Sequence, residues 1–129
     1  MTRPELLNGA NLAFIGDAYY ELYIRKYLIG KQITNQNLLH KLAVKYVSAK
    51  GHNKIVIGLL DQFTEEELVI YKRGRNHSSG VSRKNLKISE YLCSSGFEAV
   101  IGYLYLTNQE ARLHLLIDKA IKIVEEEHE

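Results

Sequence analysis

The chain has 129 residues, of which 46% are hydrophobic and 25% are charged, a balance that is typical of a folded globular protein and excludes an intrinsically disordered one. At this length we expect a single domain over residues 1–129. The net charge is only +2. The lone cysteine excludes an intramolecular disulfide, and no stretch approaches the ~20 apolar residues of a membrane span, so we expect a cytoplasmic protein without membrane contact.

The spacing of the apolar residues, together with a single proline, predicts an all-α fold of about seven helices. Thr64 followed by Glu67 is a capping box that opens one of them, and Gly51 is expected to separate two others. Residues 74–85 are expected to be a loop. The predicted helices cover residues 11–29, 34 or 35 to 50, 52–63, 64–73, 88–94, 96–107 and 109–127.

Three acidic residues stand in helices that are otherwise apolar or tyrosine-rich. Asp17 follows Gly16 directly, Glu21 lies one helical turn later, and Glu98 is in the apolar segment 96–106. An ionised acid on a core-facing stripe is costly unless it is paired or bound to a metal. Two helices that each contribute a carboxylate therefore suggest a Mg²⁺ or Mn²⁺ site, because these cations prefer oxygen ligands.

Simpler roles for these acids remain open at this point. Asp17 can serve as a helix-cap acceptor or as the partner of an arginine. Glu21 can pair with Arg25, four residues further along the same helix. Spacing alone does not decide between these roles and a metal site.

A basic segment stands out in the near-neutral chain. Residues 71–89 contain six Lys or Arg residues and no Asp or Glu. Such a segment indicates contact with a polyanion, and the simpler alternative is a solvated loop between helices.

Several sequence motifs resemble those of the ribonuclease III family. "LAFIGDAYYELYIR" (12–25) resembles the family motif "LEFLGDAVL", and "GFEAVIGYLYL" (96–106) resembles its second acidic motif. "VSAKGHNKI" and "YKRGRNHSSG" also match, and the whole is most similar to the short bacterial branch, Mini-ribonuclease III, which lacks a double-stranded-RNA-binding domain. The resemblance implies the ribonuclease III endonuclease-domain fold, no such appended domain, and a homodimer with Phe14 at its interface.

The resemblance also implies roles for individual acids. Asp17 and Glu98 match the catalytic acids, and both would bind Mg²⁺, with Mn²⁺ as a substitute. Glu21 is a further expected metal ligand. Two other acids of the usual family set are replaced here by Ala13 and Ser95, which leaves the number of bound ions open.

By this resemblance we expect a Mg²⁺-dependent endoribonuclease that hydrolyses double-stranded RNA to 5′-phosphate and 3′-hydroxyl ends. The expected substrate is the 23S ribosomal RNA precursor, and a ribosomal protein is an expected helper. Alternatives are a non-catalytic RNA-binding or ribosome-associated module and a helical adaptor protein. The expected RNA-binding residues are Lys72, Arg73, Arg75, Asn76, Ser78, Ser79, Arg83 and Lys84, with Lys87 nearby.

Overall fold

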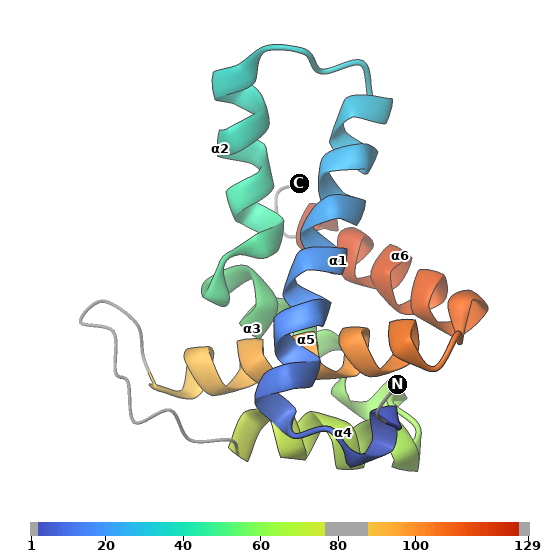
Figure 1. Ribbon diagram of the computed structural model, residues 1–129. Coiled ribbons are helices and arrows are strands. Elements are labelled where there is room, and N and C mark those ends of the chain that lie inside the picture. Colours follow the sequence, from blue (N-terminus) through green and yellow to red (C-terminus); the bar gives the residue numbers. More distant parts are fainter. Residues whose placement is uncertain (1–2, 77–87, 127–129) are drawn as a thin grey trace.

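The structure is a computed structural model that describes residues 3–76 and 88–126. Every regular element in these two ranges is helical, which confirms the predicted all-α fold (Figure 1). No helix in the described part of the chain is both long and apolar enough to cross a membrane. The α-helices are α1 (Gly9–Gly30), α2 (Gln36–Val47), α3 (Ala49–Leu59), α4 (Glu65–Asn76), α5 (Ile88–Leu106) and α6 (Glu110–Glu126), with short 3-10 helices η1 (Pro4–Leu6) and η2 (Leu60–Gln62).

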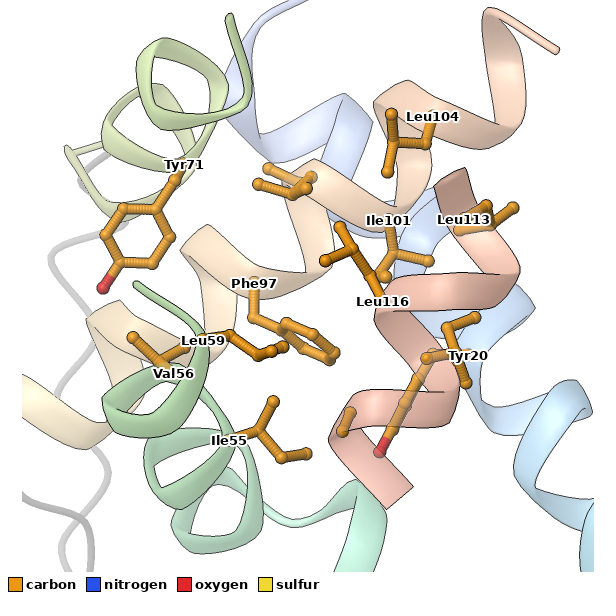
Figure 2. Packing of buried hydrophobic residues seen from close by; sticks show 14 of the residues in the cluster. Tyr20, Ile55, Val56, Leu59, Tyr71, Phe97, Ile101, Leu104, Leu113 and Leu116 are labelled. Atoms are coloured by element: carbon orange, nitrogen blue, oxygen red, sulfur yellow. The ribbon is translucent and has the colours of Figure 1, made fainter. Parts of the chain in front are cut away.

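Helix α5 lies at the centre of the molecule, where α1, α3, α4 and α6 all contact it (Figure 1). Phe97, Val100 and Ile101 of α5 are completely buried. Figure 2 shows the Phe97 side chain pointing toward Ile55 and Leu59 of α3. A helix that is apolar on nearly all sides is typical of a buried position, and this composition accounts for the central place of α5.

One continuous helix, α5, replaces the two helices expected over 88–94 and 96–107. Gly96 does not break the helix. A Cβ atom on Gly96 would lie 2.6 Å from a ring carbon of Tyr71, so this glycine lets α4 approach α5 closely. The described residues therefore form six α-helices where the sequence suggested about seven.

The boundary between α2 and α3 lies at Ser48 and not at Gly51, as the sequence had suggested. The Ser48 hydroxyl accepts a hydrogen bond from the Gly51 backbone N–H at 3.0 Å and so caps α3. A Cβ on Gly51 would lie 2.4 Å from the Lys45 carbonyl oxygen. The glycine thus permits the tight corner between the two helices.

The predicted capping box at the start of α4 is confirmed. The Thr64 N–H donates to Glu67 Oε1 at 3.0 Å, and the Glu67 N–H donates to Thr64 Oγ1 at 3.1 Å. The same carboxylate accepts from Arg112 of α6, through Nε at 2.8 Å and Nη2 at 2.9 Å. Glu67 is only 3% exposed, so this forked pair compensates a buried charge and ties α4 to α6.

We expect Arg112→Met to lower the free energy of unfolding by about 3 kcal/mol, because it leaves the buried Glu67 carboxylate without its charged partner. Urea denaturation measures the loss. Arg25→Met is the matched control, since it removes only the exposed pair of Arg25 with Glu21 and should cost about 0.5 kcal/mol or less. Equal losses in the two variants would contradict the role given to the buried pair.

Candidate active site

Helices α1 and α5 touch through their main chains next to Asp17. A Cβ atom on Gly16 would lie 1.8 Å from the carbonyl oxygen of Glu98, so only glycine fits at this position. On the facing helix, a Cβ on Gly102 would lie 2.0 Å from the carbonyl oxygen of Leu12. Two glycines, one on each helix, therefore create a crossing with no side chain between the backbones.

The two expected catalytic acids both lie at this crossing. Asp17 follows Gly16 and is exposed, and Glu98 is the half-buried residue whose carbonyl group faces Gly16. The Asp17 carboxylate forms no ion pair within residues 3–76 and 88–126, so the structure does not give it the arginine partner that the sequence left open. The fold brings the main chains that carry the two acids into direct contact.

Glu21 is engaged elsewhere. Its Oε1 accepts from Arg25 Nη2 at 3.0 Å, which is the simpler arrangement considered from the sequence. No group of three or more His, Cys, Asp or Glu side chains that could hold a metal ion occurs in the described part of the chain. The described acids at the crossing are Asp17 and Glu98, and a pair of carboxylates suits Mg²⁺, which usually retains several waters.

The end of α4 lies against the same turn of α5. A Cβ on Gly74 would lie 2.5 Å from the Cβ of Ala99 and 2.7 Å from the carbonyl oxygen of Ser95. A Cβ on Gly9 would lie 2.4 Å from the carbonyl oxygen of Arg73, so the start of α1 also touches this end of α4. The basic end of α4 and the acidic crossing thus flank one segment of α5, residues 95–99.

The basic residues at this end of α4 have different surroundings. Lys72 is exposed, whereas Arg73 is half-buried and its Nη1 donates to the carbonyl oxygens of Glu5 at 2.8 Å and Leu7 at 3.1 Å. Arg73 therefore anchors the segment before α1. The expected contact of Arg73 with RNA stays a prediction. A test of that contact has to distinguish it from the structural role of Arg73.

Arg75 and Asn76 extend α4 beyond its expected end near Arg73. Arg75 Nε donates to Asn76 Oδ1 at 3.3 Å, and its guanidinium lies over the Tyr71 ring, 5.9 Å from the ring centroid. These contacts hold two polar side chains at the helix terminus. The other expected RNA-binding residues, Ser78, Ser79, Arg83 and Lys84, lie outside the described residues, as does Lys87.

One residue near the site was not singled out by the sequence. His52 of α3 is completely buried, and its ring packs between Tyr20 of α1 and Phe97 of α5. Nothing in the spacing of the five histidines distinguishes it, because burial depends on which helices meet around it. His52 thus adds a buried polar ring that contacts both helices carrying the expected catalytic acids.

Comparison with known proteins assigns the chain to a family. The ribonuclease III domain matches residues 10–109. The Mini-ribonuclease 3 of Enterococcus faecalis is 47% identical over 125 residues, covering 95% of each chain, and that of Streptococcus pneumoniae is 48% identical over 127 residues, covering 97% of this chain and 99% of the relative. The chain belongs to the ribonuclease III family.

A solved structure agrees with this assignment. The crystal structure of a Fusobacterium nucleatum protein superposes with a TM-score of 0.82 at 33% identity, covering 91% of this chain and 93% of that one. Membership of the ribonuclease III family confirms the prediction made from the two acidic motifs, and the chain is an endoribonuclease.

Two positions depart from the acids usual in the ribonuclease III motifs. Ala13 is 8% exposed and Ser95 is 6% exposed, so both are buried against neighbouring helices. Phe14, between Ala13 and Gly16, points the other way and is 82% exposed, the largest exposed fraction among the large hydrophobic side chains of the described residues. The helix that carries Asp17 therefore has one face in the core, whereas Phe14, Leu22 and Ile29 expose large apolar side chains on its surface.

Proposed function

We propose that this ribonuclease III family member is a Mg²⁺-dependent endonuclease of double-stranded RNA, with Asp17 and Glu98 as its catalytic carboxylates. The observation that supports it is the contact of Gly16 with the Glu98 main chain, which gathers acids from two helices at one crossing. The basic end of α4 beside the same turn of α5 provides positive charge for phosphates.

A divalent cation, when bound, supplies a water of lowered pKa and positive charge for the phosphodiester oxygens. Asp17 and Glu98 would hold the ion through carboxylate oxygens, and the exposure of Asp17 suits a site open to substrate. Glu21 is a proposed additional ligand after release from Arg25, and Mn²⁺ is a proposed substitute for Mg²⁺. The proposed products carry 5′-phosphate and 3′-hydroxyl ends.

The proposed RNA surface comprises Lys72, Arg75 and Asn76, with Arg73 as a further candidate. Duplex RNA hides its base edges in a deep major groove, so these side chains would recognise phosphates and 2′-hydroxyl groups more than sequence. Ser78, Ser79, Arg83 and Lys84 are part of the same proposal.

Cutting both strands of a duplex needs two sites that face opposite backbones. We infer a two-fold homodimer in which exposed Phe14 is covered by the partner copy. An exposed phenyl ring on the helix that carries the site supports this proposal, because burying it would fix the distance between the two acidic crossings. The proposed unit is the single domain of residues 1–129.

The proposed natural substrate is a stem of the 23S ribosomal RNA precursor, cut in the cytoplasm with a ribosomal protein as helper. The test is incubation of the pure protein with such a stem and Mg²⁺, followed by end mapping. Paired cuts on the two strands, with 5′-phosphate ends, are expected. Binding without cleavage under Mg²⁺ and Mn²⁺ would overturn the catalytic proposal and favour a non-catalytic RNA-binding module.

We expect Lys72→Ala and Arg75→Ala each to weaken duplex RNA binding to a similar extent for different sequences, and each to reduce the salt slope of log K by about 1, because each removes one phosphate contact. Filter binding at several salt concentrations measures both. Lys122→Ala, which removes an exposed lysine on α6, is the control and should leave the slope unchanged. Slopes unaltered in all three variants would remove the end of α4 from the RNA surface.

A further inference from the structure

Arg73 of α4 holds the start of α1 through both its side chain and its main chain. Its Nη1 donates to the carbonyl oxygens of Glu5 at 2.8 Å and Leu7 at 3.1 Å. A Cβ atom on Gly9 would lie 2.4 Å from the carbonyl oxygen of Arg73, so the two main chains also touch. These contacts fall on either side of Asn8, the N-cap residue of α1. One residue of α4 therefore fixes the chain at the point where α1 begins.

The surroundings of Arg73 distinguish this arrangement from a loose surface contact. The Arg73 side chain is half-buried, and Gly9 is buried. A hydrogen bond from a charged donor is roughly twice as strong as one between neutral groups, and the guanidinium is planar, so its N–H directions are fixed. Two carbonyl groups that accept from one nitrogen of this rigid group are thus held in a defined position relative to α4.

The next residue, Gly74, attaches the same end of α4 to α5. A Cβ atom on Gly74 would lie 2.5 Å from the Cβ of Ala99 and 2.7 Å from the carbonyl oxygen of Ser95. Ala99 directly follows Glu98, and Ser95 precedes it by three residues. Arg73 and Gly74 therefore join the start of α1 to the segment of α5 that carries the second acid.

This connection bears on the first acid because α1 is one continuous helix. Asp17 lies eight residues after Gly9 on α1 and next to the crossing with α5. The Asp17 side chain is exposed and forms no ion pair within the described ranges, so its place relative to Glu98 depends on how α1 itself is held. Packing sets the crossing, and the two hydrogen bonds of Arg73 add a directional restraint at the start of the helix.

We propose that Arg73 is a positioning residue for the acidic pair: its guanidinium fixes the start of α1 to α4 and α5, so that Asp17 is held in place relative to Glu98. A catalytic group displaced by about 1 Å can cost on the order of 100-fold in rate. The inference rests on the proposed function. It gives Arg73 a role separate from the expected contact with RNA, because Nη1 is already engaged by two carbonyl groups.

Two variants of Arg73 separate positioning from phosphate binding. Arg73→Met removes both the charge and the hydrogen bonds. Arg73→Lys keeps the charge but lacks the planar guanidinium. A phosphate contact needs the positive charge, so Arg73→Lys would then retain function that Arg73→Met loses. Positioning needs the rigid group that meets both carbonyl oxygens, so both variants are expected to be impaired.

The experiment measures single-turnover cleavage of duplex RNA at saturating protein with Mg²⁺, together with filter binding at several salt concentrations. Both variants are expected to lower the cleavage rate about 10-fold and to leave the salt slope of log K unchanged. Normal cleavage by Arg73→Lys, or a slope reduced by about 1 in Arg73→Met alone, would overturn the proposal.

Arg112→Met is the control for lost stability. It breaks the buried pair with Glu67 at the other end of α4, and it is expected to cleave at the parental rate at a temperature where all variants are folded. A loss of rate in Arg112→Met equal to that in Arg73→Met would mean that cleavage merely follows stability, and the positioning role would fall.

The wild-type protein provides a second measurement in case the Arg73 variants fail to fold. In side-chain ¹⁵N spectra, the Nη protons of Arg73 are expected to exchange more slowly than those of exposed Arg25 and to keep their shifts when duplex RNA is added without a divalent cation. Equal exchange, or a shift on adding RNA, would overturn the proposal. A wild-type protein that does not cleave duplex RNA would end the proposed function and this inference with it, whereas parental cleavage by Arg73→Met would end only the inference.

Discussion

Asp17→Asn is expected to lower the single-turnover rate of duplex RNA cleavage by roughly 10³-fold, the equivalent of about 4 kcal/mol of transition-state stabilisation. The substitution keeps the shape of the side chain and removes the negative charge that would hold the cation. Asp17 is exposed and forms no ion pair in the described part of the chain, so folding should change by less than about 0.5 kcal/mol.

Denaturing gel electrophoresis of the RNA measures the cleavage, and thermal unfolding confirms that the variant is folded. Asp61→Asn, which neutralises another exposed acid, on η2, is the matched control and should cleave normally. Glu98→Gln should resemble Asp17→Asn, and the double variant should lose little more than either alone, because both acids would serve one ion. An Asp17→Asn protein that cleaves within tenfold of the parent would exclude Asp17 as a central ligand.

The largest effect on stability is expected for Gly16→Ala. The added methyl group would lie 1.8 Å from the Glu98 carbonyl oxygen and 2.7 Å from the Gly102 nitrogen, and backbone atoms cannot move aside as a flexible side chain can. Helices α1 and α5 must then separate. We expect a loss of at least about 3 kcal/mol in the free energy of unfolding.

The control for this variant lies on the same helix. Gly30 has no atom within 4 Å of its potential Cβ, so Gly30→Ala should be neutral or stabilise the protein by up to about 1 kcal/mol. Urea denaturation of both variants decides the matter. Similar stabilities for Gly16→Ala and Gly30→Ala would mean that the crossing tolerates a side chain, and the close approach of the two acids would lose its structural basis.

Local sequence signals predicted the elements that depend on neighbouring residues. The capping box of Thr64 and Glu67 forms as expected, since a cap is a contact between residues three apart. Gly51 was expected to separate two helices and Gly96 to begin a new one, yet both glycines lie inside continuous helices. Each glycine accommodates a segment that approaches closely after folding, and a single sequence does not distinguish that need from a turn.

For the candidate site, too, the sequence pointed to some residues and missed others. Asp17 and Glu98 were singled out because their motifs are specific, and the structure brings together the main chains that carry them, while their catalytic role stays a prediction. The role of Arg73 in binding the carbonyl groups of Glu5 and Leu7 was missed, because an arginine in a basic segment resembles its exposed neighbours. His52 was passed over for a related reason, since its surroundings come from three separate helices.

The two glycine contacts of α1 also fix the distance between the end of α4 and the acidic crossing. Gly9, which touches the Arg73 carbonyl, and Gly16, which touches that of Glu98, are seven residues apart, or about 10 Å along a helix. A continuous helix neither stretches nor shortens, so the offset between the proposed RNA-binding end of α4 and the proposed cleavage site at the acidic crossing is constant. Within this proposal, substitutions at either end would change what is bound or cut, while the interval between the two places stays the same.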